Sequence, residues 1–250
     1  MKFRLLDILL FALLFIFVNA FPVDLFPIGV IEQLIIRIVL RFVLLLYYIY
    51  LIWRYRINLF KFANYRRGLL FLPFIIICFS NIIAGAIAGS SFDVSIDPVI
   101  LPLTIFYHLL GVIVEELLFR SFIQNSLVFA SSIKRILASA GIFALFHLIN
   151  IVNVSSADAL ISVLIQVVYA FGLGLLLGLI YEYTYSIPLC VVFHLLFNFT
   201  NQILVHDIFH LSIPTLVYYL TAIISGLIVG VYAFVIYFFI LRRNDRYFRE

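Results

Sequence analysis

Long, nearly uninterrupted apolar runs are the feature of this sequence that most limits its fold. Each run is about 20 residues long, which is the length that a helix needs to cross the hydrocarbon core of a bilayer. Apolar residues make up 66% of the 250 residues and charged residues only 11%, about half of the charged share of a soluble domain. Outer-membrane barrels use alternating segments instead. The sequence therefore predicts an all-α polytopic membrane protein and excludes soluble enzymes and nucleic-acid-binding proteins.

Eight such runs can be assigned to membrane spans. Their connections are too short to contain a separate soluble domain, so we expect a single transmembrane domain over residues 1–250. The expected spans run from about Leu5 to Phe21, Ile35 to Trp53, Gly68 to Ala88, Ile100 to Phe129, Ile136 to Ile149, Ala159 to Tyr181, Ile187 to Val205 and Ile213 to Leu241.

Basic residues alternate along the chain in a way that predicts the orientation of these spans. Lys and Arg accumulate in the cytoplasmic loops of membrane proteins. Here they are Lys2, Arg4, Arg54, Arg56, Lys61, Arg66, Arg67, Lys134, Arg135, Arg242, Arg243, Arg246 and Arg249. We therefore expect both termini to be cytoplasmic. Arg37 and Arg41, near the start of the second span, could reach the outer headgroups or face the bundle, and we give them no function.

The first span also resembles a secretory signal, because Lys2 and Arg4 precede an apolar stretch that ends in Val18-Asn19-Ala20. Asp7 lies inside this stretch, and further spans follow it immediately. We therefore expect an uncleaved first helix. The abundance of Ile, Phe and Asn hints at a bacterial protein, which would place the chain in a bacterial plasma membrane.

Ionisable and amide side chains within the spans are the candidates for chemistry. An ionisable group costs about 2.5 to 3.5 kcal/mol at the centre of a bilayer on insertion scales, and such groups usually have a function. Polar groups can also join helices by hydrogen bonds. The candidates are Glu115, Glu116 and Arg120 in the fourth span, His147 in the fifth, and His194 and Asn198 in the seventh.

Helical geometry separates the two adjacent glutamates. Neighbouring residues of a helix point about 100° apart, so Glu115 and Glu116 should have different roles. Glu116 and Arg120 are spaced i,i+4 and can form an ion pair that gives structural support. Glu115 has no such partner in its own helix. We therefore predict that Glu115 is a general base that takes a proton from water.

The seventh span carries two hydrogen-bond donors on one face. His194 and Asn198 are also spaced i,i+4, so an imidazole and an amide can converge on one cavity. Fixed donors of this kind stabilise the oxyanion that develops when an amide is attacked. His147 could orient the water beside Glu115 or help to deprotonate it. Either histidine alone could instead be a packing residue, so the prediction depends on all four side chains meeting around one intramembrane cavity.

Three motifs in order on successive spans resemble one known family. EExxxR occurs as Glu115, Glu116 and Arg120, FxxxH as Phe143 and His147, and HxxxN as His194 and Asn198. This pattern resembles the CPBP family of intramembrane endopeptidases, which comprises CAAX prenyl proteases and bacteriocin-processing enzymes. The stretch 166–186 is also similar to the connecting helix of that family. The resemblance covers residues 100–200, the predicted catalytic core, and Ser121 stands where the family often has Gly.

The resemblance implies hydrolysis of peptide bonds in a membrane chamber that opens toward the cytoplasm. It assigns Glu115 and His147 to the activation of water, and His194 and Asn198 to the stabilisation of the oxyanion. Glu116, Arg120 and Phe143 would support the site. The expected partners are the lipid bilayer and a membrane-associated peptide or protein, such as a CAAX substrate or a bacteriocin in processing or self-immunity. The oligomeric state stays open.

The residues leave the question of a metal open. Glu115, His147 and His194 could supply a zinc ion with three ligands and an open position. A nitrogen that binds zinc cannot also donate to the oxyanion, so this arrangement would replace the role given to His194 above. The alternative is a glutamate mechanism without a metal. Apart from zinc, no cofactor is expected.

Two other classes of function are compatible with polar groups in the spans. A non-catalytic immunity or scaffold protein could bind its partner through the same cavity. A proton-coupled transporter also uses intramembrane Glu and His residues. Transporters often consist of two halves with matching hydropathy, and this sequence shows no such repeat. The endopeptidase interpretation therefore takes precedence over both.

Overall fold

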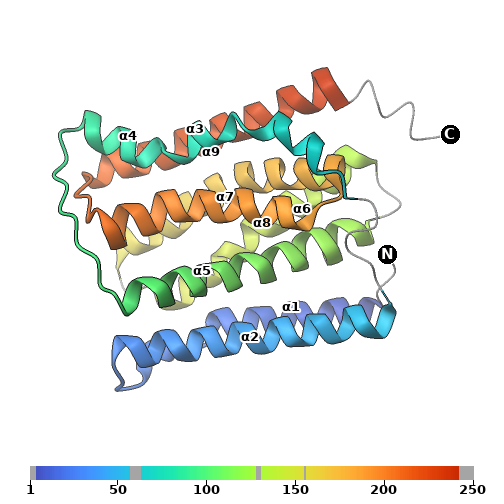
Figure 1. Ribbon diagram of the computed structural model, residues 1–250, viewed down its shortest axis with the longest axis horizontal. Helices are drawn as coiled ribbons and strands as arrows, with labels where there is room; N and C mark the ends of the chain where they lie inside the picture. Colours follow the sequence, from blue (N-terminus) through green and yellow to red (C-terminus); the bar gives the residue numbers. More distant parts are fainter. Residues whose placement is uncertain (1–3, 57–62, 128–130, 155, 242–250) are drawn as a thin grey trace.

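The computed structural model describes residues 4–56, 63–127, 131–154 and 156–241. Within these ranges every regular element is a helix (Figure 1). Stretches of tighter 3₁₀ or wider π geometry are labelled η. The elements are α1 (Leu5–Ala20), η1 (Val23–Leu25), α2 (Val30–Tyr55), η2 (Tyr65–Phe71), α3 (Phe74–Cys78), α4 (Ser80–Ile87), α5 (Ile100–Glu116), η3 (Leu117–Gln124), α6 (Ser132–Phe146), η4 (His147–Asn153), α7 (Ala157–Thr184), α8 (Ile187–Asn198), η5 (Phe199–Ile208), α9 (Thr215–Ile236) and η6 (Tyr237–Leu241).

Six helical stretches in the described ranges are long and apolar enough to cross a bilayer, and each corresponds to one of the expected spans. They are Val30–Tyr55, Ile100–Gln124, Ser132–Val152, Ala157–Thr184, Ile187–Ile208 and Thr215–Phe239. The first expected span forms the shorter apolar helix α1, which has 16 residues. The protein is therefore an all-α polytopic membrane protein, as the sequence predicts.

The third expected span differs from the prediction, because it does not form one continuous helix. Residues 68–88 are divided among η2, α3 and α4. One interruption falls at Pro73, whose ring nitrogen has no hydrogen to donate to a helical hydrogen bond. The other falls at Phe79, whose φ of −88° and ψ of 9° lie outside the helical region. The broken segment packs against α8 and α9. This packing compensates for the helical hydrogen bonds that are lost at the two interruptions.

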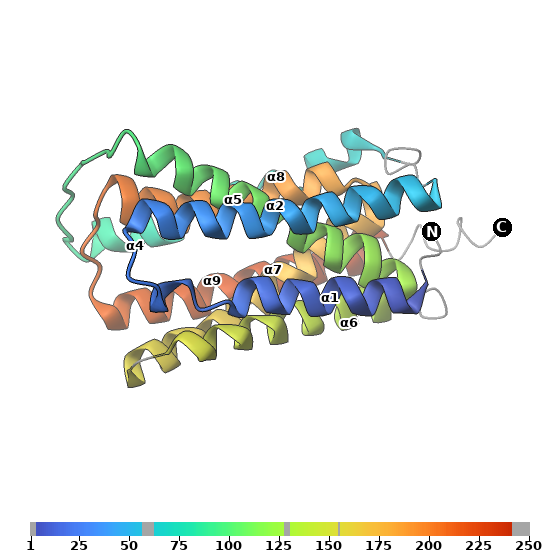
Figure 2. The same cartoon turned by 90° about the horizontal axis from the view of Figure 1, so that it is seen from below.

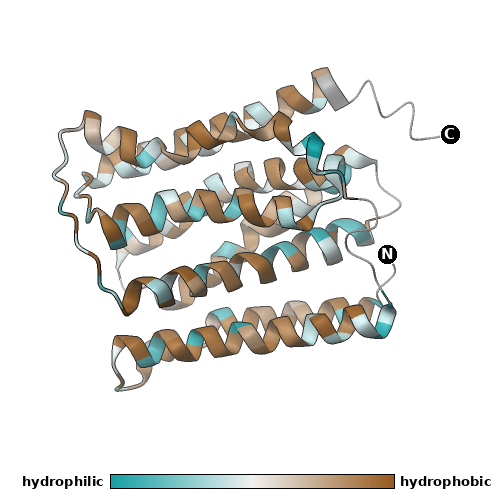
Figure 3. Cartoon of the chain, viewed as in Figure 1, coloured by the Kyte–Doolittle hydropathy of each residue, from teal (hydrophilic) through white to brown (hydrophobic). Residues whose placement is uncertain are grey.

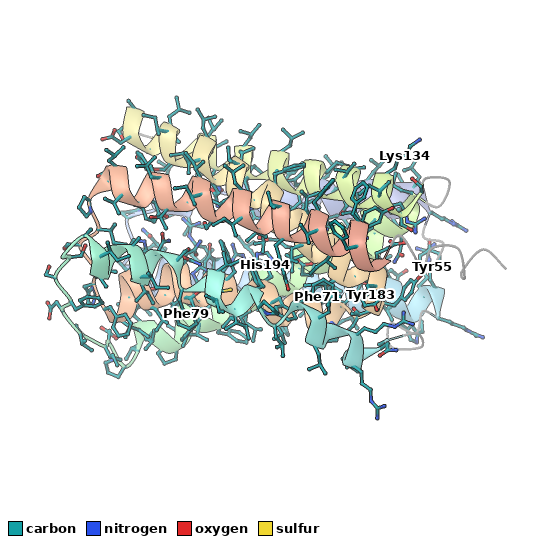
Figure 4. The ribbon with its side chains drawn as sticks, turned by 90° about the horizontal axis from the view of Figure 1, so that it is seen from above. Tyr55, Phe71, Phe79, Lys134, Tyr183 and His194 are labelled. Atoms are coloured by element: carbon teal, nitrogen blue, oxygen red, sulfur yellow. The ribbon has the colours of Figure 1, made fainter. Side chains whose placement is uncertain are left out.

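Successive segments run in opposite directions along the bundle (Figure 1). The start of α1, the end of α2, the start of α6 and the end of α9 lie at one end, which Figure 4 marks with Tyr55 and Lys134. This is the end to which the sequence assigns the basic loops. Lys2, Lys61, Arg242, Arg243, Arg246 and Arg249 lie outside the described residues. The connection from α4 to α5, with Asp93 and Asp97, lies at the opposite end. The described loops therefore agree with the predicted alternation of charge.

A carboxylate caps the start of α5, the helix that carries the two glutamates. The backbone N–H groups of Ile100 and Val99 each donate to Asp97 Oδ1 over 2.8 Å. These donors favour the ionised carboxylate, so the pKa of Asp97 is lowered. The cap satisfies two of the N–H groups that the first turn of a helix leaves unpaired. It therefore helps to fix the point at which α5 begins.

Large apolar side chains cover the outside of the bundle. Trp53, Ile76 and Ile87 are 75%, 72% and 83% exposed. Figure 3 shows hydrophobic residues along most of each helix, with hydrophilic residues gathered at the ends of α2 and η2 on the basic side. Water would strongly disfavour such a surface, whereas hydrocarbon accepts it. The helices therefore present their apolar surface to lipid.

Helix α7 lies at the centre of the bundle, in contact with α6, α8 and α9 (Figures 1 and 2). Among the described long helices it has the largest buried share. It approaches α9 closely at two glycines. A Cβ atom on Gly172 would lie 2.1 Å from the carbonyl oxygen of Gly226. Small residues allow such close packing of membrane helices, where dispersion forces drive association.

We expect Gly226→Ala to destabilise the packing of α7 on α9. The new Cβ would lie 2.6 Å from Tyr169 Cα, so the two backbones would have to separate, at a cost of about 1–3 kcal/mol. Gly230→Ala is the matched control on the same helix, because its Cβ would meet its nearest neighbour at 3.8 Å. Thermal unfolding in detergent should show a lower midpoint for Gly226→Ala alone. Equal midpoints for the two variants would contradict this account of the interface.

Candidate active site

The acidic motif lies where α5 changes its helical geometry. Glu115 and Glu116 are close to the end of α5, and the chain continues directly into the π-helix η3. Such π segments inside helices are frequent at functional sites. The side chain of Glu115 is 21% exposed and lines a cavity, whereas Glu116 is completely buried. The two adjacent glutamates therefore face different surroundings, as their angular separation predicts.

The buried Glu116 carboxylate accepts hydrogen bonds from two other helical segments. Arg120 Nε donates to its Oε2 over 2.9 Å, which is the predicted i,i+4 ion pair. Its second oxygen, Oε1, lies 2.8 Å from His194 Nδ1 on α8. Glu116 thus neutralises Arg120 and also positions His194. The contact with His194 is not evident from the spacing of residues within one helix.

Arg120 connects the acidic motif to α6. Its Nη1 donates to Ser139 Oγ over 2.9 Å, and Ser139 Oγ in turn donates to the carbonyl of Phe119 over 3.1 Å. The guanidinium also lies 5.6 Å from the centre of the Phe143 ring. Its Nη2 has no hydrogen-bond partner among the described residues. The cost of burying this charge is offset mainly by Glu116 and by these polar contacts.

His147 lies at the junction of α6 and η4, with one ring nitrogen already bonded. Its Nδ1 is 2.9 Å from the carbonyl oxygen of Phe143. A carbonyl oxygen can only accept, so the proton must be on Nδ1. In the neutral ring Nε2 is then an acceptor. His147 is therefore arranged to accept a hydrogen bond from a molecule in the cavity.

His194 lies two turns along α8, between the two glutamates. The helix begins sharply, because Tyr185 adopts a left-handed conformation with φ of 51° and Ser186 Oγ accepts from the N–H of Leu189. The Nε2 of His194 lies 3.7 Å from Glu115 Oε2, while its Nδ1 contacts Glu116. The imidazole thus has a carboxylate near each nitrogen. Because a carboxylate oxygen can only accept, the ring proton on Nδ1 is the one directed to Glu116.

Phe143 packs against both imidazoles. Its ring centre lies 4.8 Å from that of His147 and 5.7 Å from that of His194, and both contacts are edge-on. Phe119 packs against the same ring at 5.0 Å. Phe143 therefore limits the positions of both histidines, which agrees with its place in the FxxxH motif.

One cavity of about 180 Å³ brings the four candidate side chains together. Glu115, His147, His194 and Asn198 all line it. Figure 4 places His194 between Phe79 and the end marked by Tyr55 and Lys134. The side chains come from α5, η4 and α8, so the arrangement depends on the packing of three membrane segments. The carboxyl of Glu115 faces this cavity and not lipid.

Several polar residues that the three motifs do not include also line the cavity. They are Asn19, Arg41, Tyr107, His108, Asn150, Gln166, Tyr169 and Gln202. Arg41 is the most informative of them, because a charge in the middle of an apolar run already signals a function. Its position at the start of the expected span made an interaction with headgroups equally reasonable. Only the packing of α2 on α5 directs it inward.

Ser121, the residue that departs from the family pattern, has a partner of its own. Its hydroxyl lies 2.5 Å from the hydroxyl of Tyr48 on α2, and both side chains are buried. The hydrogen bond joins η3 to α2 beside the acidic motif. The substitution of Ser for Gly is thus accommodated by a polar contact.

The possible zinc ligands suggested by the sequence are Glu115, His147 and His194. Among the residues that the structure describes, no group of three or more His, Cys, Asp or Glu side chains is arranged to hold a metal ion. Glu115 and His194 approach each other, but His147 does not complete a set with them. We therefore assign no step of the reaction to a metal.

An all-α bundle with a carboxylate, two imidazoles and an amide around one polar cavity defines an integral membrane protein with a site suited to hydrolysis. Residues 97–200 match the family model described as type II CAAX prenyl endopeptidase Rce1-like. This segment is thus similar to the family that the three motifs resemble. All four candidate side chains lie within the matched residues. A comparison with curated proteins gives no match.

We expect Arg120→Met to destabilise the protein severely. The change leaves Glu116 buried without its ion-pair partner, a loss that typically costs about 3–5 kcal/mol. Arg54→Met, which removes an exposed guanidinium at the basic end, is the control. Unfolding in detergent should show a large loss for Arg120→Met and almost none for Arg54→Met. A small loss for Arg120→Met would mean that the contact with His194 is sufficient to stabilise the buried Glu116 carboxylate.

Proposed function

We propose that the protein is an intramembrane endopeptidase that hydrolyses peptide bonds in membrane-associated peptides or proteins. The observation that carries this proposal is the position of Glu115. Its carboxylate lies 3.7 Å from His194 Nε2 and shares one cavity with His147 and Asn198. The cavity thus contains a base, an acceptor that can orient water, and two hydrogen-bond donors. Amide hydrolysis in water without an enzyme lacks such positioned groups.

In the proposed reaction, Glu115 first removes a proton from water. The hydroxide attacks the carbonyl carbon of the scissile peptide bond, and the proton stays on the Glu115 carboxyl. His147 supports this step, because its Nε2 can accept a hydrogen bond from the same water while Nδ1 is bound to Phe143. A water molecule that is already oriented reacts faster, because its translational and rotational entropy has been lost before the attack.

The attack produces an oxyanion on the former carbonyl oxygen. Asn198 can donate to it through its amide, and His194 through the N–H at Nε2. His194 has this second N–H only as an imidazolium, so this role requires both ring nitrogens to carry a proton while Nδ1 contacts the Glu116 carboxylate. The negative charge moves from Glu115 to the oxyanion, so it stays beside the same cation throughout the step. The change in electrostatic energy is therefore small.

Collapse of the tetrahedral intermediate completes the reaction. The carbon–nitrogen bond breaks, and the proton held by Glu115 passes to the leaving amine. The products are a carboxylic acid and an amine, which exchange a proton to become a carboxylate and an ammonium group, and Glu115 returns to its ionised form. No covalent intermediate with the enzyme is required.

The proposed substrates belong to a bacterial cell, in which we assign the basic end of the bundle to the cytoplasm. Prenylated C-terminal CAAX peptides fit the description of the matched family. Bacteriocin peptides, in processing or in self-immunity, are the other candidates. Both kinds of substrate would approach from the membrane, where the cavity lies.

We expect Glu115→Gln to abolish hydrolysis while the protein stays folded. Loss of a general base typically costs about 10²–10⁴ in rate, and the amide retains the size of the carboxyl. The measurement is cleavage of a panel of fluorogenic peptides by protein purified in detergent. Glu32→Gln, which removes an exposed carboxylate outside the cavity, should keep wild-type activity.

The same assay tests the alternatives. Activity that survives a chelator supports the mechanism without a metal, whereas its loss would bring back a zinc site. Cleavage by Glu115→Gln at the wild-type rate would exclude Glu115 as the base. In cells, protection against a bacteriocin by the Glu115→Gln variant would favour a non-catalytic immunity protein.

We expect Asn198→Ala and Asn198→Asp to lower kcat by about 10²–10³, the usual effect of removing one oxyanion donor. Asp keeps the shape of the side chain but replaces the donor by an acceptor, so both variants should lose the same interaction. KM should change little, because the contact forms mainly in the transition state. A near wild-type kcat for Asn198→Asp would show that Asn198 does not donate to the oxyanion.

A further inference from the structure

A second cavity, with a volume of about 460 Å³, continues the catalytic cavity toward one end of the bundle. The residues that line both cavities are Tyr107, His108, Gln166, Tyr169 and Gln202. The two spaces are therefore in contact. A third cavity of about 210 Å³ shares Ser162, His206 and Tyr218 with the second. We call the second and third cavities together the outer passage.

The outer passage leads to the end of the bundle opposite the basic loops. Thr104 lies in the second turn of α5 and Ser162 in the second turn of α7, and both helices begin at that end (Figure 1). Tyr218 lies in the first turn of α9, and Asp207 is one residue before the end of η5. These side chains come from the parts of their helices that are nearest to the connection between α4 and α5.

The bundle is tightly packed on the other side of Glu115. Toward the basic end, η3 continues with Leu118 and Phe122, which are both completely buried. The Phe122 ring packs edge-on against Phe11 of α1 at 5.0 Å and against Tyr48 of α2 at 5.1 Å. Aromatic rings from three helical segments thus fill the space between Glu115 and the basic end. The space around Glu115 therefore continues through the outer passage and not through this packed layer.

Polar side chains line most of the outer passage. In its larger cavity three lining residues are aliphatic, and the others carry a hydroxyl, amide, imidazole or carboxylate group. A peptide that leaves its helix within a membrane loses hydrogen bonds of its backbone N–H and C=O groups, and each unsatisfied group has a large free-energy cost there. The lining of the passage supplies new partners for such a segment. It is therefore suited to an extended peptide.

We propose that peptide substrates reach Glu115 through the outer passage, from the end of the bundle opposite the basic loops. This inference rests on the proposed endopeptidase function and names the route to the same site. The sequence assigns the basic loops to the cytoplasm, and the family resemblance implies a chamber that opens there. Because the passage and the basic loops lie at opposite ends, these two expectations are not compatible.

The length of the passage sets how much of the substrate it holds. Thr104 lies about three turns before Glu115 on α5, which corresponds to about 16 Å. An extended peptide advances about 3.3 Å per residue, so about five residues separate the outer end of the passage from the bond beside Glu115. The substrates are thus membrane-associated peptides that expose an extended segment of at least this length on that face.

Cysteine accessibility in membrane vesicles tests this route without requiring hydrolysis. A membrane-impermeant maleimide is added to right-side-out and to inverted vesicles, and it reacts with thiolates, which form where water reaches the side chain. Asp93→Cys and Lys134→Cys, exposed at opposite ends of the bundle, show which face the reagent reaches. We expect Thr104→Cys and Ser162→Cys to react only where Asp93→Cys reacts. Their reaction where Lys134→Cys reacts, or in neither preparation, would overturn the proposed route.

Phe106→Cys and Leu164→Cys are the matched controls for these two thiols. Each lies two positions further along the same helix, and the native side chains are 43% and 50% exposed on the apolar surface of the bundle. We expect neither to react in either preparation. Reaction as fast as that of the passage thiols would show that the reagent arrives through lipid, and the route would be contradicted. All variants carry Ala in place of Cys78 and Cys190, which are buried.

A bulky adduct shows whether the substrate uses the passage, and separates this inference from the proposed function. In detergent, a polyethylene-glycol maleimide on Ser162→Cys should abolish cleavage of the fluorogenic peptides, whereas methylthiolation of the same thiol should retain most of it. The bulky adduct on Lys134→Cys should leave cleavage unchanged. Full cleavage by the bulky Ser162→Cys adduct would overturn the route and leave the endopeptidase intact. Labelling of the expected face in a protein that cleaves no peptide would support the passage and contradict the endopeptidase.

Discussion

The site depends on one buried carboxylate that accepts hydrogen bonds from an arginine and a histidine. Glu116 joins Arg120 of η3 to His194 of α8, and Arg120 extends the connection to Ser139 of α6. Moving any one of these groups into lipid without its partners would have a large free-energy cost. The three segments are therefore held in one register by their polar atoms, in a region where hydrophobic association between helices is weak.

This arrangement determines what the neighbouring Glu115 can do. Because Glu116 satisfies Arg120 and one nitrogen of His194, the carboxyl of Glu115 stays available to the cavity. The same carboxylate holds His194 by Nδ1, so that Nε2 lies 3.7 Å from Glu115 Oε2. Two adjacent residues of one helix thus form a support and a base. Exchange of their roles would require a rotation of α5 by about 100°.

The sequence predicts the parts of this structure that depend on local geometry. Spacing of i,i+4 correctly pairs Glu116 with Arg120, and the 100° step separates Glu115 from it. The apolar runs predict the long helices, but not the break at Pro73 and Phe79, where packing against α8 and α9 replaces helical hydrogen bonds. The contact between Glu116 and His194 joins residues that are 78 positions apart, so no local pattern contains it.

Arg41 is a second residue whose surroundings cannot be predicted from local sequence. A charge within a span indicates a function, yet the sequence does not reveal which way the helix turns it. Gly111 and Tyr107 on α5 decide this, because one leaves space for the guanidinium and the other stacks on it. The cavity therefore combines a catalytic half from the matched segment with a cation from α2, which lies outside that segment. In such a division, residues outside the family motifs can determine which peptides are cut, while the chemistry of cleavage stays the same.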